Sequence, residues 1–85
     1  MRQYKRLSIA GATYFFTLTL QNRKSRILTS NIDKLRFAFK KVRTKHPFQI
    51  DAIVTLPDHI HLMMTLPLGD TNYSKRLNLI KGTFS

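Results

Sequence analysis

The sequence predicts a small domain of the α+β class, in which two helices pack against an antiparallel sheet. One stretch, over 13–20, alternates between apolar and polar residues. Two further alternating stretches, over 48–55 and 59–66, flank a proline-containing break, as the two strands of a hairpin do. Apolar residues recur at helical spacing over 31–46 and 73–85. The predicted order of elements is therefore β-α-β-β-α.

Length and charge limit the classes of protein to consider. A chain of 85 residues buries only about 60% of the surface that its unfolded form exposes, so we expect one domain, over 1–85, with a thin core. Fifteen Lys and Arg residues oppose four acidic residues, which gives a formal net charge of +11. Such a charge attracts polyanions. Nucleic acid is the first candidate partner, and an anionic membrane surface is the second.

Cysteine and apolar content exclude other classes. The absence of cysteine rules out a disulfide-stapled secreted domain and a thiolate metal site. No apolar run approaches the roughly 20 residues of a membrane-spanning helix, and the N-terminus lacks an uninterrupted secretory segment. We therefore expect a soluble cytoplasmic protein that has no membrane partner.

The first strand and the loop after it differ sharply in composition. The strand has an apolar face and a threonine-rich face, and only Phe15 breaks the alternation. The apolar face comprises Tyr14, Phe16, Leu18 and Leu20, and the other comprises Thr13, Thr17 and Thr19. The stretch over 21–30 has no strand periodicity and is predicted to be a basic loop.

The first long helix is predicted over about 31–46. Ser30 is a plausible N-cap, and Pro47 prevents the helix from continuing. Phe37 lies off the apolar stripe and should not join the main core. The stripe consists of Ile32, Leu35, Phe39 and Val42.

The hairpin is predicted to have one apolar face on each strand. In the first strand that face holds Ile50, Ala52 and Val54, with Ile53 as the exception. In the second strand Ile60, Leu62, Met64 and Leu66 oppose His59, His61, Met63 and Thr65. A three-residue turn that pairs Thr55 with His59 would keep both apolar faces on one side of the sheet.

The second helix is predicted to begin behind a Thr71 cap and to run to Ser85, with Tyr73, Leu77, Ile80 and Phe84 as its apolar stripe. The resulting β-α-β-β-α order lacks the closing strand of a ferredoxin-like βαββαβ unit. We therefore expect an incomplete ferredoxin-like sheet, truncated at its C-terminus. An unpaired sheet edge favours a homodimer.

The triplet His59-Ile60-His61 is the strongest candidate for chemistry. Residues two apart on a strand share a face and lie about 6.6 Å apart, so both imidazoles could bind one metal ion. A third ligand is then required, and Asp51 and Asp58 are the candidates within the chain. Asp58 is better suited to a turn. From the spacing alone, two ordinary surface histidines remain the commoner explanation.

The cations divide into two candidate DNA-binding groups, although solvated surfaces could account for both. The loop group is Arg23, Lys24 and Arg26, and the helix group is Lys75, Arg76 and Lys81. Tyr4, Tyr14 and Phe15 could stack on unpaired bases, with core packing favoured for Tyr14. A phenolic oxygen can attack a phosphodiester, but Tyr73 lies on the apolar stripe and is expected in the core.

Several stretches, in order along nearly the whole chain, resemble one family. They are Gly11-Ala12-Thr13-Tyr14-Phe15-Phe16-Thr17, Arg43-Thr44-Lys45-His46-Pro47-Phe48, Leu56-Pro57-Asp58-His59-Ile60-His61-Leu62, Thr65-Leu66-Pro67 and Ile80-Lys81-Gly82-Thr83-Phe84-Ser85. This combination resembles the tyrosine-dependent HUH transposases, specifically their REP-associated branch. It favours a metal-binding role for His59 and His61 over the surface alternative.

The resemblance implies an HUH transposase-like fold in which His59 and His61 hold a divalent cation, Mg²⁺ or Mn²⁺. It also implies binding of single-stranded or hairpin DNA. In the family, a tyrosine cuts the strand, becomes joined to its 5′ end and later reverses the step. That tyrosine and the third metal ligand lie downstream of the segments matched here, so we expect no catalytic residue in this chain beyond the metal ligands.

Two alternatives stay open. The chain could be a nucleic-acid-binding module that uses no metal, with His59 and His61 as surface residues. It could instead be an assembly domain that associates through the sheet edge.

Overall fold

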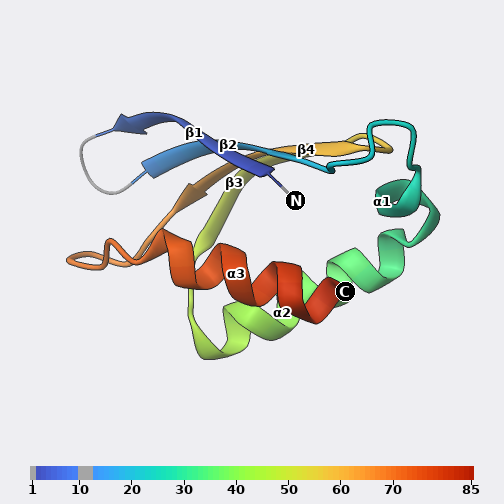
Figure 1. Ribbon diagram of the computed structural model, residues 1–85. Helices are drawn as coiled ribbons and strands as arrows, with labels where there is room; N and C mark the ends of the chain where they lie inside the picture. Colours follow the sequence, from blue (N-terminus) through green and yellow to red (C-terminus); the bar gives the residue numbers. More distant parts are fainter. Residues whose placement is uncertain (1, 10–12) are drawn as a thin grey trace.

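The computed structural model describes residues 2–9 and 13–85, with side chains described for 13–85 (Figure 1). One layer is a four-stranded sheet, and the other consists of helices. The strands are β1 (Arg2–Ile9), β2 (Thr13–Thr19), β3 (Gln49–Thr55) and β4 (His59–Thr65). The helices are α1 (Ile27–Ser30), α2 (Ile32–Lys45) and α3 (Tyr73–Phe84).

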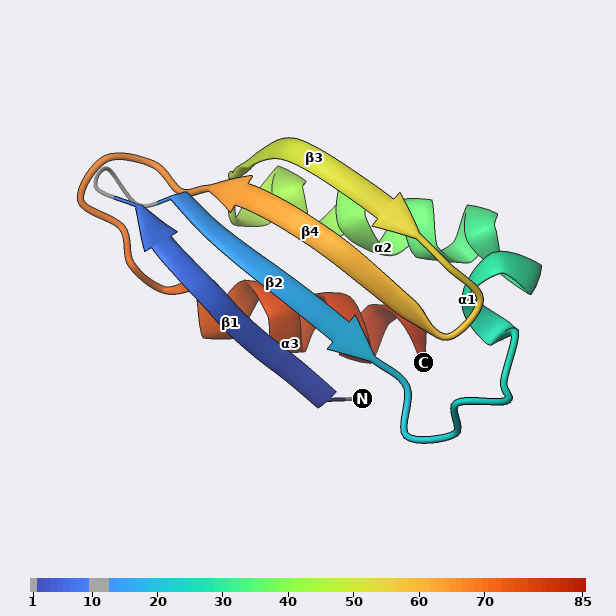
Figure 2. The ribbon, with the colours of Figure 1, turned by 90° about the horizontal axis from the view of Figure 1, so that it is seen from above.

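The sheet is antiparallel throughout and has the order β1-β2-β4-β3 (Figure 2). β1 was not predicted from the sequence, because its basic residues hide any alternation. Pairing with β2, from Arg2 opposite Thr19 to Ile9 opposite Thr13, defines this strand. β1 covers the edge of β2, so β1 and β3 form the outer edges. The homodimer stays a prediction, with the edge beside β2 no longer available for it.

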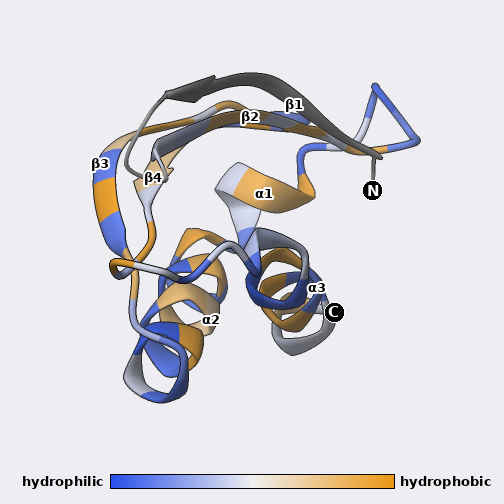
Figure 3. Cartoon of the chain, turned by 90° about the vertical axis from the view of Figure 1, so that its left-hand side faces the viewer, coloured by the Kyte–Doolittle hydropathy of each residue, from blue (hydrophilic) through white to orange (hydrophobic). Residues whose placement is uncertain are grey.

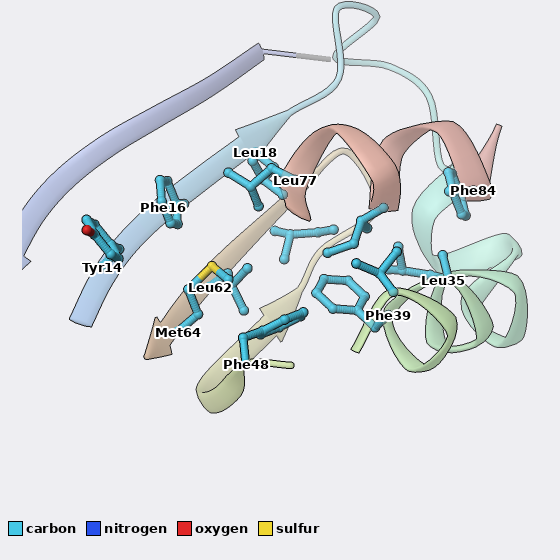
Figure 4. Close-up of a cluster of buried hydrophobic side chains, with 14 of the residues drawn as sticks. Tyr14, Phe16, Leu18, Leu35, Phe39, Phe48, Leu62, Met64, Leu77 and Phe84 are labelled. Carbon is cyan, nitrogen blue, oxygen red and sulfur yellow. The ribbon is translucent and has the colours of Figure 1, made fainter. Parts of the chain in front are cut away.

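The helices cover one face of the sheet and bury the core between the two layers (Figures 3 and 4). The predicted alternation of β2 and β4 is confirmed, because the side chains of the predicted apolar faces are buried against the helices. The predicted stripes of α2 and α3 meet them, while Phe37 is 59% exposed on the outside of α2. The most deeply buried large side chains are Phe16, Leu18, Leu28, Ile60, Leu62, Met64 and Leu77.

The hairpin differs from the prediction in its register. Thr55 pairs with Ile60 and not with His59, and the Leu56 amide donates to the His59 carbonyl at 2.8 Å. Leu56 thus lies opposite His59, and the turn consists of two residues, Pro57 and Asp58, instead of the predicted three. The register recovers at a bulge, since Ile50 pairs with Met64 but Ala52 with Met63, which leaves Asp51 as the extra residue.

The bulge reverses the predicted faces of β3. Ile53 pairs with the buried Leu62, so it faces the helices and is no exception. Val54 pairs with His61 on the other face and is 55% exposed. The predicted apolar face of Ile50, Ala52 and Val54 is therefore wrong beyond Ile50, because directly opposed residues share a face.

Smaller differences concern the helix termini. The predicted basic loop ends in the short helix α1, and Asn31 rather than Ser30 is the N-cap of α2. Asn72 rather than Thr71 caps α3, and its side chain accepts a hydrogen bond from the Lys75 amide at 3.2 Å. None of the helices in the described part of the chain is long and apolar enough to cross a membrane.

Arg76 fastens α3 to the loop between α2 and β3. Arg76 is 4% exposed, and its side chain donates to the carbonyls of His46, Asn72 and Pro47, at 2.9 to 3.2 Å. The same guanidinium donates to the Asp70 carboxylate at 2.8 Å. Its donors are directed at four acceptors within the protein. The prediction that Arg76 belongs to a surface group of DNA-binding cations is therefore wrong, because this residue is buried.

Replacing Arg76 by Lys should lower the free energy of unfolding by about 3 kcal/mol, because an ammonium group cannot satisfy four separately placed acceptors. Urea denaturation would measure the change. The neighbouring Lys75→Ala variant is the control, since Lys75 is exposed and its loss should change stability by less than about 0.5 kcal/mol. Equal effects of the two substitutions would contradict the structural role of Arg76.

Candidate metal centre and nucleic-acid interface

His59 and His61 project from β4 on the face of the sheet that the helices leave uncovered. Their rings lie 4.9 Å apart between centroids and are perpendicular. Ile60, between them, is 1% exposed in the core. The arrangement follows from strand geometry, in which alternate side chains share a face. We call this side of the sheet the histidine face.

Both imidazoles use Nδ1 for hydrogen bonds within the protein. His59 Nδ1 lies 2.8 Å from an oxygen of Asp58, and His61 Nδ1 lies 3.3 Å from the Thr17 hydroxyl on β2. The described hydrogen bonds involve neither Nε2 atom, so these are the nitrogens available to an ion. A carboxylate that holds the far nitrogen of a histidine is a typical outer partner of a metal ligand.

Asp58 connects the histidines to the basic loop. Its second carboxylate oxygen accepts a hydrogen bond from Arg23 Nε at 2.5 Å. These contacts hold the pKa of the Asp58 carboxyl at about 2, below its ordinary value of 3.8, with the Arg23 hydrogen bond as the largest cause and the His59 hydrogen bond next. Asp58 therefore stays ionised at neutral pH.

The turn that carries Asp58 is fixed by the backbone of the β2–α1 segment. The Leu20 amide donates to the Asp58 carbonyl at 2.9 Å, and the Leu28 amide donates to the Pro57 carbonyl at 3.3 Å. Leu28 is itself fully buried. The sequence Leu56-Pro57-Asp58 thus supplies a tight turn whose carbonyls are satisfied by a neighbouring loop, and the first histidine follows immediately.

The structure does not supply a third metal ligand from the predicted candidates. Asp51 belongs to β3 and lies beside the end of β4 that is distant from His59. There its carboxylate accepts hydrogen bonds from Thr65 at 2.6 Å and Gln49 at 2.7 Å. The Asp58 carboxylate contacts Nδ1 of His59 and Nε of Arg23, so it is not placed to bind an ion held by the Nε2 atoms. Within residues 13–85, no group of three His, Cys, Asp or Glu side chains is placed to hold one ion. The two imidazoles fit a divalent cation as a partial site.

The two predicted groups of cations lie in different places. Arg23, Lys24 and Arg26 are exposed in the loop after β2, near the end of β4 that carries His59. Lys75 and Lys81 lie on α3, in the helical layer. Partial burial lowers the pKa of Lys81. The structure therefore places only the loop group beside the histidines.

The tyrosines of the described side chains lie away from the histidines. Tyr14 is 6% exposed in the core, and the Tyr73 ring packs against it with centroids 4.9 Å apart. The Phe16 ring, 6.0 Å from that of Tyr14, also packs against Tyr73, at 5.3 Å. The core position predicted for Tyr73 is confirmed. Tyr4, the remaining stacking candidate, lies outside the residues whose side chains are described.

Sequence reasoning missed one residue of this face. Thr17 contacts His61 directly, and the threonine-rich alternation of β2 was a signal that could have found it. Phe15 was predicted as a residue that could stack on unpaired bases, but its position opposite Met63 needed the register between β2 and β4. That register links segments too distant in the sequence for local patterns to predict.

The antiparallel fold and the paired histidines are those of a transposase-like domain. Residues 8–85 match the model of the family described as "Transposase IS200 like", and the chain belongs to that family.

The relatives are more specific than the family. The chain is 46% identical, over all of its 85 residues, to the REP-associated tyrosine transposase of Escherichia coli (strain K12), of which it covers 52%. It is 44% identical to a Haemophilus influenzae (strain Rd) protein assigned to the same transposase type, of which it covers 48%. The chain thus spans about half the length of these relatives.

A solved structure supports the fold directly. The structure of a REP-associated tyrosine transposase bound to a REP hairpin matches 99% of this chain with a TM-score of 0.86 and 46% sequence identity. The chain covers 51% of that protein. The α+β antiparallel fold is thereby confirmed.

Asp58 should contribute to the loss of stability in acid. Because its folded pKa lies below its ordinary value, its contribution is complete above pH 3.8 and is lost as the pH falls towards 2. An Asp58→Asn variant should therefore show a shallower loss of unfolding free energy over this interval. Asp70, whose pKa Arg76 also lowers, would retain its share in both proteins. Chemical denaturation at several pH values would measure the slopes.

The control for this measurement is Asp33→Asn. Asp33 is 95% exposed and contacts only Arg36, at 3.7 Å, among the ion pairs of the described residues. Its replacement should leave the acid slope unchanged. A slope that is identical in wild type and Asp58→Asn would contradict the coupling of Asp58 to Arg23 and His59.

Proposed function

We propose that this chain is the DNA-binding and metal-binding part of a tyrosine transposase of the REP-associated type. It holds single-stranded or hairpin DNA against the histidine face, next to the loop of Arg23, Lys24 and Arg26. The observation that carries the proposal is the pair of imidazoles 4.9 Å apart, braced by Asp58 and Thr17. DNA as the substrate also favours a cytoplasmic location.

The Nε2 atoms of His59 and His61 would hold a divalent cation, Mg²⁺ or Mn²⁺. When bound, the ion stabilises negative charge on a phosphate and fixes its position. The remaining contributions come from the protein itself. Asp58 fixes the orientation of the His59 ring, Thr17 fixes that of His61, and the exposed cations attract the DNA backbone.

The family reaction is cleavage of a DNA strand through a 5′-phosphotyrosine, followed by rejoining. Tyr14 and Tyr73 cannot serve as the nucleophile in this fold, because both pack in the layer between the sheet and the helices. The attacking hydroxyl must come from outside residues 13–85. We therefore assign to the described segment the binding and orientation of the phosphate, and not the covalent step.

One observation favours a second candidate function. The described residues offer two imidazoles but no complete set of three ligands. The chain could accordingly act as a DNA-binding module without a metal, in which the histidines donate hydrogen bonds to DNA. Metal binding by the isolated chain separates the two functions.

Mn²⁺ should broaden the ring NMR signals of His59 and His61 selectively, because a paramagnetic ion relaxes nuclei close to it. The effect should disappear in a His59→Ala/His61→Ala variant. Asp58→Asn should weaken Mn²⁺ binding about tenfold or more, since it removes an outer partner of a ligand. The titration detects weak binding, as expected of a partial site.

The matched control is the third histidine. His46 ends α2 on the helical side of the molecule, and a His46→Ala variant should bind Mn²⁺ as the wild type does. Equal broadening of all three histidines would show that no specific site exists and would favour the metal-free module.

DNA binding should depend on the loop cations more than on equally exposed cations of α2. A Lys24→Gln/Arg26→Gln variant should lower the slope of log affinity against log salt by about 1.4, or about 0.7 for each lost contact with a single strand. Fluorescence anisotropy with a labelled oligonucleotide would measure it. Arg23 is left in place because it supports Asp58.

The control is Lys41→Gln/Lys45→Gln, which removes the same charge from the exposed surface of α2. If both variants reduce affinity and slope equally, binding depends on net charge alone and the proposed interface is wrong.

A further inference from the structure

Phe15 is an aromatic side chain on the histidine face. It pairs with Met63 across the β2–β4 ladder, and the neighbouring pair along the same face is Thr17 with His61. The Phe15 and His61 rings lie 6.4 Å apart between centroids. Phe15 therefore lies on the side of β2 opposite to Phe16, which is fully buried under the helices.

The position of Phe15 is not explained by the core. The buried cluster lies between the sheet and the helices, and Phe15 does not belong to it. Its side chain stays half-buried, although Thr17 and Thr19 on the same face are only 7% and 9% exposed. A large apolar ring thus remains accessible beside smaller polar residues that are covered.

Phe15 is part of an apolar row that crosses three strands. Ala52 on β3 pairs with Met63 on β4, and Met63 pairs with Phe15 on β2. Ala52 is exposed and small, so its side chain leaves the neighbouring Met63 side chain uncovered on that side. The row lies next to the His61 pairs and about 6.6 Å from them along the strand.

Polar groups border the row on its other side. The Thr13 and Thr65 hydroxyls lie 2.9 Å apart, and Thr65 donates to Asp51 at 2.6 Å. The histidine face thus has imidazoles at one end, an apolar row in the middle and a hydrogen-bonded polar group at the other end. A ligand with a phosphate at the imidazoles could place an adjoining flat, apolar group on the row.

We propose that the Phe15–Met63 row is a binding site for an unpaired nucleobase. The base stacks on the Phe15 ring while the adjoining phosphate lies at the histidines. Aromatic side chains on the open face of a sheet are a common platform for single-stranded bases, and stacking accepts any base because each has a π-face. The polarizable thioether of Met63 extends the platform. This inference rests on the proposed function, since it places the DNA on the same face.

The test uses a DNA hairpin with a single-stranded tail, in which 2-aminopurine occupies each tail position in turn. One position should lose fluorescence when the wild-type chain binds. Phe15→Leu keeps an apolar side chain but removes the π-face, so it should abolish that quenching and lower affinity about tenfold. Phe15→Tyr keeps the ring and should preserve both properties.

An abasic tail position gives the decisive comparison, and it needs no protein variant. Removing the quenched base should weaken wild-type binding by about the same factor as Phe15→Leu, and the two changes together should cost no more than either alone. Phe37→Leu is the matched control, because Phe37 is 59% exposed on the outside of α2 and should leave DNA binding unchanged.

Three results would overturn the base site. The first is Phe15→Leu affinity within twofold of the wild type, and the second is an equal loss on intact and abasic tails, which would indicate a structural role only. The third is quenching at no tail position. If the Lys24→Gln/Arg26→Gln variant still weakens binding in these cases, the DNA interface stands and only the base site is refuted.

Discussion

The docking of the β3–β4 turn against the β2–α1 segment is the constraint on which the candidate site depends. Two backbone hydrogen bonds, to the carbonyls of Pro57 and Asp58, set the start of β4 and therefore the position of the first histidine. The Asp58 side chain then uses its two oxygens for different partners, His59 and Arg23. One short turn thus fixes a candidate metal ligand, its hydrogen-bond partner and the direction of a basic loop.

The two faces of the sheet carry different kinds of residue. The helix-facing side carries the aliphatic and aromatic residues that hold the fold together, and the tyrosines of the described side chains belong to it. The other side carries the imidazoles, the threonines and Phe15. Because strand residues alternate between faces, core residues and candidate binding residues interleave along β2 and β4 without competing for the same space.

Local patterns predicted much of this arrangement. The alternation of β2 and β4 and the helical stripes of α2 and α3 were each sufficient, because one buried face imposes one period. The common face of His59 and His61 followed from the same period.

Three features required information that no local pattern contains. β1 is a strand because β2 lies beside it. The bulge at Asp51 compensates for the shorter turn, since it lets Ile50 and Ile53 both face the helices. The interior position of Arg76 depends on carbonyls that the fold brings together from the α2–β3 loop. Charge alone could not distinguish this residue from the exposed Lys75 next to it.

The central position of β4 beside β2 also determines when the site comes into existence during folding. Thr17 and His61 are 44 residues apart in the sequence, and Arg23 and Asp58 are 35 apart, so neither contact can form within an isolated hairpin. Both wait for the slow, entropically costly closure of the long loop that contains α2 and β3. A ligand that needs these contacts recognises only the completed domain, and by mass action it protects the whole chain against unfolding.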